Sequence, residues 1–161
     1  MRLFIAIQLS EEIRKTLVAF MHELKKQGVE GNYVPAQNLH MTLAFIGEYE
    51  DPARVKEILE KVPFSEFRLT LSDTGHFGNI LWAGVKGNQK LKAYVKELRA
   101  ALTAGGIPCD GEKFVPHITL VRKASAKKTW HGSLPKAEMT VKGAALMKSE
   151  QKNGKVVYKV L

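Results

Sequence analysis

The pattern His-x-Thr-Leu occurs twice in this chain of 161 residues, at 40–43 and at 117–120. The two copies lie 77 residues apart, and the same offset places the apolar segment LFIAI at 3–7 on ILWAG at 80–84. One offset that relates several elements is the mark of an internal repeat. The sequence therefore predicts that a strand–helix–strand unit is used twice, with one His-x-Thr strand in each copy.

Apolar periodicity predicts where the elements of the two copies lie. The first copy has a helix from the N-cap Ser10 to Gly28, and the helix of the second copy ends at Gly105, again 77 residues later. Strands are predicted at 3–9, 39–46, 67–72, 79–86 and 115–121, and further helices at about 51–62 and 88–104. After a looser segment at 123–137, we expect 138–147 and 155–161 to form a hairpin around Asn153-Gly154, a strong tight-turn signal.

Length and composition limit what the chain can be. With 45% hydrophobic and 25% charged residues, it has the profile of a globular protein of one domain or two small lobes. Its apolar runs are far shorter than the ~20 residues that cross a bilayer, and its N-terminal stretch is too short for a signal peptide. We therefore expect a cytoplasmic protein with no membrane contact. The single cysteine, Cys109, excludes an intrachain disulfide and a cluster of thiol ligands.

The charge balance indicates the kind of partner. The net charge is +9 and the isoelectric point is about 9.7, which favours an anionic partner, with nucleic acid as the first candidate. Solubility alone is the alternative, because the lysines fall on predicted helix faces and loops and no run of like charge exceeds two residues.

Each His-x-Thr strand presents an imidazole beside a hydroxyl, because residues i and i+2 of a strand point to the same face. The pairs are His40 with Thr42 and His117 with Thr119. If the two copies face one another, these four side chains converge in one pocket. Such a set suits phosphoryl transfer, since one imidazole can accept a proton from the nucleophile while the other protonates the leaving oxygen. The hydroxyls can donate to phosphate oxygens, and Arg122 on the continuation of the second strand can add positive charge.

Other interpretations of the histidines are weaker. A single histidine in an apolar strand is more often structural than catalytic, but two that match under a repeat offset favour function. A zinc site needs a third ligand, and neither motif has an Asp, Glu or Cys within two residues of its histidine, so we expect no metal. His22 is predicted to lie on a solvated helix face, and His76 and His131 are predicted to lie in loops.

The segments VPAQNLHMTLAFIG at 34–47 and FVPHITLVR at 114–122 resemble the paired motifs of the two-histidine (2H) phosphoesterase superfamily. Within it, they are most similar to the RNA 2′,3′-cyclic phosphodiesterases, also called 2′-5′ RNA ligases. The resemblance extends from LFIAIQLSEEIRKTL near the N-terminus through ILWAGV at 80–85. It implies an α+β fold in which residues 1–161 form a single bilobal domain with pseudo-two-fold symmetry. Antiparallel sheets would line a central cleft, with the helices outside.

The resemblance also implies an activity, the hydrolysis of RNA 2′,3′-cyclic phosphate ends to 2′-phosphomonoesters without metal or other cofactor. By this resemblance, His40 is the general acid that protonates the departing 3′ oxygen and His117 is the base that activates water. The near-equivalence of the half-sites leaves the reverse assignment open. Thr42, Thr119 and Arg122 would hold the phosphate. The expected partner is RNA with a 2′,3′-cyclic phosphate terminus, and we expect a monomer with no obligate protein partner.

Three aromatic residues near the motifs could stack on a terminal base, namely Tyr33, Phe77 and Phe114, with core or lid packing as the competing interpretation. Trp82 is assigned to the core. Two other functions stay open on sequence alone: an RNA-binding module without turnover, and a phosphodiesterase that acts on small cyclic phosphates or 2′-5′ linkages. Reversible 2′-5′ RNA ligation by the same site also stays open.

Overall fold

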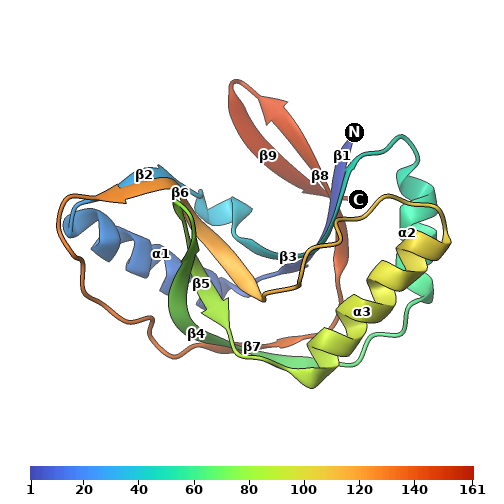
Figure 1. Ribbon diagram of the computed structural model, residues 1–161, viewed down its shortest axis with the longest axis horizontal. Helices are drawn as coiled ribbons and strands as arrows, with labels where there is room; N and C mark the ends of the chain where they lie inside the picture. The colour runs from blue at the N-terminus through green and yellow to red at the C-terminus, as the bar shows by residue number, and fades with distance from the viewer.

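The computed structural model describes residues 1–161 and contains three α-helices, one short 3-10 helix and nine strands (Figure 1). In chain order, the elements are β1 (Arg2–Gln8), α1 (Glu11–Lys26), β2 (Val29–Tyr33), η1 (Ala36–Asn38), β3 (His40–Glu48), α2 (Pro52–Lys61), β4 (Phe67–Phe77), β5 (Ile80–Val85), α3 (Gln89–Ala104), β6 (His117–Ala126), β7 (Glu138–Val141), β8 (Ala145–Lys152) and β9 (Lys155–Val160). All strand pairs are antiparallel, in one sheet of order β3-β1-β8-β9 and another of order β2-β6-β5-β4-β7.

The two long helices begin where their capping residues predict. The Ser10 hydroxyl accepts a hydrogen bond from the Ile13 amide at 3.2 Å and so starts α1. The Asn88 side chain accepts from the amides of Lys90 and Leu91 and starts α3 in the same way. Each helix buries one apolar face. These faces join the inward sides of both sheets in a single cluster of 36 buried residues.

The predicted duplication is confirmed in three dimensions. The first unit is β1-α1-β3 and the second is β5-α3-β6, and in each unit the His-x-Thr strand pairs antiparallel with the first strand. The strand order β3-β1-β8 of one sheet matches the order β6-β5-β4 of the other. β3 and β6 contact one another where the sheets meet, while the helices lie on the outside of the molecule (Figure 1). The fold is the predicted α+β arrangement of two related halves.

The C-terminal hairpin differs from the prediction. Residues 138–147 do not form one strand, because β7 pairs with β4 in the five-stranded sheet whereas β8 pairs with β1 and β9 in the other. The chain crosses between the sheets at 142–144. The turn itself was predicted correctly, since Asn153 and Gly154 both have positive φ, at 53° and 77°, as a two-residue hairpin turn requires.

Other strands differ in length from their predictions. β2 was not predicted, and β6 continues to Ala126, into the segment that was expected to be looser. β4 continues to Phe77, so His76 lies in a strand and not in a loop, whereas His131 lies outside the helices and strands and His22 is exposed on α1, as expected. Residues 72–77 were missed because glycine and aspartate interrupt their alternation.

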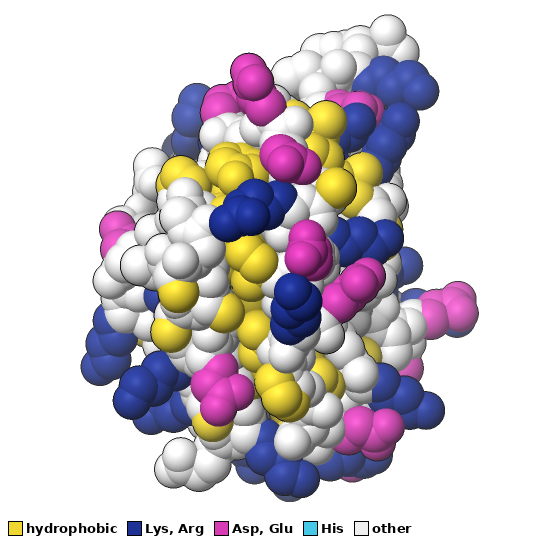
Figure 2. Space-filling view, turned by 90° about the vertical axis from the view of Figure 1, so that its right-hand side faces the viewer, with side chains coloured by type: hydrophobic (Ala, Val, Ile, Leu, Met, Phe, Trp, Pro, Cys, Tyr) yellow, Lys and Arg dark blue, Asp and Glu magenta, His cyan; other side chains and the backbone are white.

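The outer face over α2 and α3 carries interspersed Lys, Arg, Asp and Glu side chains, with no large area of one sign and no histidine in view (Figure 2). No helix combines the length and the apolar character that crossing a bilayer requires.

Candidate active site

His40 is fixed at both ring nitrogens. Its Nδ1 lies 2.7 Å from the carbonyl oxygen of Asn38, and its Nε2 lies 2.8 Å from the hydroxyl of Thr42. Because a carbonyl can only accept, Nδ1 must carry the proton in the neutral ring. Nε2 then accepts from the Thr42 hydroxyl, two residues along the same strand.

His117 repeats half of this arrangement. Its Nδ1 lies 2.6 Å from the carbonyl oxygen of Val115, the residue 77 positions after Asn38. Its Nε2 has no hydrogen-bond partner within the chain, and Thr119 makes no hydrogen bond to it. Both imidazoles are therefore oriented through Nδ1. Nε2 is free of the chain in His117 but contacts the Thr42 hydroxyl in His40. The second half-site is the more open of the two.

A β-bulge follows each His-x-Thr motif at the same place. In β3, Ile5 pairs with Ala44 and Ala6 pairs with Thr42, so Leu43 is an extra residue. In β6, Leu81 pairs with Val121 and Trp82 pairs with Thr119, so Leu120 is an extra residue, again 77 positions later. A bulge of this kind shifts the alternation of side chains by one residue.

The carbonyl that each bulge residue turns out of the ladder is satisfied from outside its own pair of strands. The Leu43 carbonyl accepts from Nε and Nη2 of Arg99 on α3, at 3.1 and 3.0 Å. The Leu120 carbonyl accepts from the amide of Val34 at 2.8 Å. The two bulges are thus fixed parts of the fold, and they set which later residues face the histidines.

The bulges decide the positions of Arg122 and Phe45. Leu120 and Val121 are both fully buried, so Arg122 returns to the face that carries His117 and is exposed. Strict alternation would have placed Arg122 on the core face with Leu120. Phe45 holds the equivalent position after the first bulge, and 49% of it is exposed. Phe45 was not predicted to be a site residue, although the offset of 77 from Arg122 could have indicated it.

β3 and β6 contact one another, so the charged groups of one half act on the histidine of the other. Burial lowers the pKa of His40, the hydrogen bond to Asn38 partly opposes this effect, and the charges of Arg122 and His117 lower the pKa further. Arg122 and His117 come from β6, whereas His40 comes from β3. The structure therefore brings the five predicted motif residues (His40, Thr42, His117, Thr119 and Arg122) to the junction of the two sheets.

Aromatic rings surround both imidazoles. Phe4 and Tyr158 lie 5.0 and 5.1 Å from His40, centroid to centroid, with Tyr158 edge-on at 84°. Phe77 and Trp82 lie 5.1 and 5.7 Å from His117. The assignment of Trp82 to the core was wrong, because its ring is half-buried beside His117. Trp82 lies beside His117 because β5 pairs with β6, with Trp82 opposite Thr119.

The other aromatic candidates lie apart from the histidine rings. Tyr33 donates its hydroxyl to the Val29 carbonyl at 2.6 Å and lies under Lys25, and burial raises its pKa. Phe114 packs against the core with the guanidinium of Arg99 over its ring. Of the three predicted stacking residues, only Phe77 contacts a motif histidine, and 44% of it is exposed.

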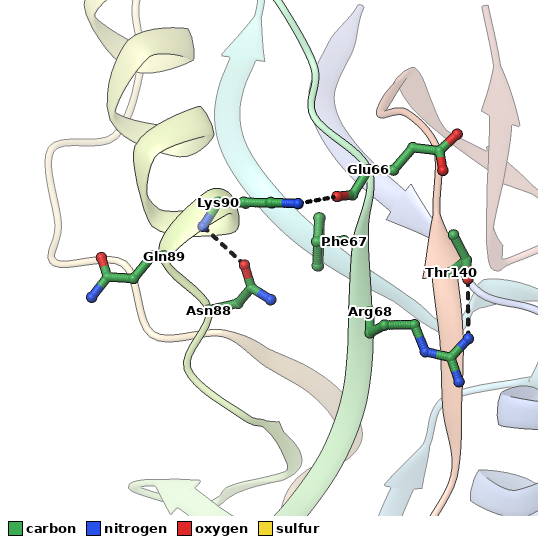
Figure 3. Close-up of a pocket in the computed structure, with 7 residues that line it drawn as sticks. All are labelled: Glu66, Phe67, Arg68, Asn88, Gln89, Lys90 and Thr140. Carbon is green, nitrogen blue, oxygen red and sulfur yellow. Dashed lines mark hydrogen bonds between the residues drawn. The ribbon is translucent and has the colours of Figure 1, made fainter.

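A separate hollow lies at the start of α3 and contains neither motif histidine (Figure 3). Its polar groups are engaged with one another: Lys90 donates to the Glu66 carbonyl, and Arg68 donates to the Thr140 hydroxyl. The hollow therefore contains none of the residues predicted to act on a phosphate. No three His, Cys, Asp or Glu side chains gather in the chain in a way that could hold a metal ion.

Comparison with known proteins identifies the family of this chain. The profile of the 2′-5′ RNA ligase superfamily matches residues 10–153. The RNA 2′,3′-cyclic phosphodiesterase of Thermotoga maritima is 32% identical over 176 aligned positions, which cover all of this chain and 93% of that protein. The protein of the same name from Thermus thermophilus is 34% identical, over all of this chain and 88% of its own length.

Solved structures of other proteins share the fold of this chain. The crystal structure of Escherichia coli LigT complexed with 3′-AMP superposes with a TM-score of 0.87 at 30% identity, covering 99% of this chain and 94% of that one. The PDE domain of MHV ns2, at 15% identity and a TM-score of 0.68, shares the fold. With the duplicated histidine strands and the match over 10–153, this chain belongs to the 2′-5′ RNA ligase superfamily.

Proposed function

We propose that this protein hydrolyses RNA ends that carry a 2′,3′-cyclic phosphate and leaves a 2′-phosphomonoester. The observation that carries the proposal is the pair of imidazoles on the contacting strands β3 and β6, each held through Nδ1 by a main-chain carbonyl. The charge of Arg122, from β6, acts on His40. Relatives that match most or all of the chain are named RNA 2′,3′-cyclic phosphodiesterases, which supports the substrate class.

The two histidines divide the proton transfers. Nε2 of His117, which has no partner in the chain, accepts a proton from water as the water oxygen attacks phosphorus. The bond between phosphorus and the 3′ oxygen breaks, and Nε2–H of His40 protonates the departing oxygen. The product carries a 2′-phosphate and a free 3′-hydroxyl. Before the next turnover, His117 releases its proton to solvent and His40 takes one up from solvent.

The phosphate lies among the cationic and hydroxyl groups of the two strands. Arg122 supplies a fixed positive charge that stabilises the negative charge of the transition state. Thr119 makes no hydrogen bond to His117, so its hydroxyl can donate to a phosphate oxygen, and Thr42 does so when His40 is protonated. Both half-sites come from one chain, so the proposed reaction needs no second subunit. The proposal also assigns the protein to the cytoplasm.

The terminal base stacks on an exposed aromatic ring. Phe45 and Phe77 are the two large aromatic side chains that lie on the histidine faces and are nearly half exposed. Stacking on such a ring suits an unpaired RNA end, because every base has a π face and a single-stranded base can leave its neighbours. Tyr33 and Phe114 have no such contact with the histidines and are assigned to packing.

The test is hydrolysis of a short RNA that ends in a 2′,3′-cyclic phosphate, in buffer with EDTA, with the product phosphomonoester identified by chromatography against 2′- and 3′-phosphate standards. We expect a 2′-phosphate from the wild type and from His22→Ala, whose histidine is exposed on α1 away from the motifs. His40→Ala and His117→Ala should fold and lose turnover. Turnover that survives in both variants contradicts the proposal.

The same assay separates the alternatives. RNA that binds in a salt-dependent way but is not cleaved would indicate an RNA-binding module. Turnover of small cyclic nucleotides or of 2′-5′-linked dinucleotides, without turnover of the RNA end, would indicate a different phosphodiesterase. Reversible 2′-5′ ligation is tested by adding an RNA with a 5′-hydroxyl, since attack by a hydroxyl in place of water uses the same two histidines.

A further inference from the structure

The C-terminal hairpin of β8 and β9 returns to the first half-site from the far end of the chain. It extends beyond the rest of its sheet (Figure 1). β9 runs back along β8 toward the sheet, and the Tyr158 ring lies edge-on to His40. Phe4 completes this group, with its ring 5.1 Å from Tyr158 and 5.0 Å from His40. The imidazole of His40 is therefore held between a ring of β1 and a ring of β9.

Asn38 makes the second link between the hairpin and His40. Its side-chain Nδ2 donates to the main-chain carbonyl of Val156 in β9 at 3.0 Å, across 118 residues of sequence. Its own carbonyl accepts from Nδ1 of His40. One residue of η1 thus contacts the catalytic imidazole through its main chain and the hairpin through its side chain.

The burial of Asn38 indicates that its hydrogen bond to β9 is a fixed part of the fold. Asn38 is the one polar residue among the 41 buried residues, with 5% of its surface exposed. A buried amide is costly unless it is hydrogen-bonded, so the bond to Val156 fixes the position of both partners. η1 is a single turn of three residues with no side-chain cap, and it packs against α1, so the Asn38 amide is the side-chain hydrogen bond that ties this turn to the hairpin.

The second half-site lacks both links. Val115, at the position equivalent to Asn38, offers the same main-chain carbonyl to His117 but has an apolar side chain that cannot donate to a strand. The rings beside His117 come from β5, which pairs with β6, and from β4, the next strand of the same sheet, and neither is an edge strand. Only the first half-site depends on a segment that lies at the edge of a sheet.

We propose that Asn38 is a positioning residue for His40, and that the β8–β9 hairpin acts as a clamp that orients this imidazole through Asn38 and Tyr158. The inference rests on the proposed function for its effect on turnover, but not for its effect on the His40 ring. Without the Asn38 side chain, η1 is free to move, its carbonyl no longer fixes Nδ1–H, and Nε2 leaves the line to the departing oxygen.

The main test is Asn38→Ala, which keeps the main-chain carbonyl and removes the bond to β9. We expect kcat to fall by about 10- to 100-fold with a smaller change in KM, since a displacement on the order of 1 Å can reduce a rate by about that factor. An NMR pH titration of the ring protons should show the His40 pKa moving up toward its ordinary value as burial is lost.

The hairpin offers a second, independent variant and a matched control. Tyr158→Ala removes the ring beside His40 and should lower kcat, whereas Tyr158→Phe keeps the ring and should retain activity. Gln151→Ala changes an exposed hairpin residue with no side-chain hydrogen bond and should match the wild type. Because Asn38 and Tyr158 act through the same clamp, the double alanine variant should lose less than the product of the two single losses.

The outcomes distinguish this inference from the proposed function. If Asn38→Ala and Tyr158→Ala both leave the His40 titration unchanged, the clamp does not exist, whatever the activity. If the titration moves but kcat of the RNA reaction does not, Asn38 does not position a catalytic group and the inference is wrong. If the wild type does not cleave the RNA, the proposed function fails, and the titration alone still decides whether the hairpin holds His40.

Discussion

Gly75→Ala is predicted to destabilise the protein because an indole ring lies against this glycine. Gly75 sits in β4 directly opposite Trp82 in β5, in extended backbone that an alanine could adopt. A Cβ added at Gly75 would lie under 3.0 Å from three carbons of the indole, Cζ2, Cζ3 and Cη2. Ordinary contacts of a Cβ begin near 3.4 Å, so the indole or the strand must move. The same indole lies beside His117.

The cost follows from this overlap. Forcing an extra methyl into a packed site costs about 1–3 kcal/mol. For a chain of this size, that corresponds to a melting temperature lower by about 2–12 °C. We also expect kcat to fall, because an indole that tilts away from Gly75 moves against the imidazole of His117.

Gly87→Ala is the matched control, since no atom lies within 4 Å of the added Cβ and the residue is exposed. It should leave stability unchanged or raise it by about 0.4–1 kcal/mol. Urea unfolding of both variants, with and without Trp82→Phe, separates overlap with the indole from other effects of the added methyl group. Phenylalanine lacks the outer part of the indole, so the overlap should be smaller in that background. The reasoning is refuted if Gly75→Ala is as stable as Gly87→Ala, or if it costs the same in the Trp82→Phe background.

Three further outcomes follow from the site geometry. Arg99→Leu leaves the Leu43 carbonyl without its two donors and should cost about 1.5–3 kcal/mol in urea unfolding, the range for hydrogen bonds to charged groups. Because the pKa of His40 is lowered in the folded state, the unfolded chain binds more protons when the pH falls below about 6.5. The contribution of His40 to stability should therefore be present above about pH 6.5 and decline below it. The difference in unfolding free energy between wild type and His40→Gln, measured at pH 7.5 and at pH 5, should show this decline. Arg122→Ala removes a charge that lowers the pKa of His40, so an NMR titration should show that pKa raised, and KM for the cyclic RNA end should rise as the phosphate loses its partner.

The sequence was sufficient where a signal repeats over a short range. The offset of 77 identified the duplicated unit, and the alternation around His40 and His117 placed each histidine beside its threonine, because neighbours at i+2 share a face of any regular strand. The N-caps Ser10 and Asn88 act within one turn of their helices, and so these starts were predictable as well. All these signals depend on residues that are close together along the chain.

The parts that could not be predicted depend on pairing between distant strands. The bulges at Leu43 and Leu120 are visible only in the register with β1 and β5, and without them Arg122 would have been placed on the wrong face. Tyr158 reaches His40 because β9 joins the sheet of β1 through β8, a choice that no local pattern near the C-terminus indicates. Trp82 looked like a core residue because aromatic strand residues usually are.

The difference between the half-sites accounts for how two equivalent motifs can perform opposite proton transfers. In the neutral ring, Nε2 of His40 is occupied by the Thr42 hydroxyl, so neither group is free to act on a phosphate. Once His40 is protonated, its Nε2–H donates and the Thr42 hydroxyl is released as a donor of its own. A bound phosphate anion opposes the charges of Arg122 and His117 and therefore favours this protonated state. In the proposed reaction, substrate binding therefore prepares His40 to act as the acid, while His117, whose Nε2 has no partner in the chain, acts as the base.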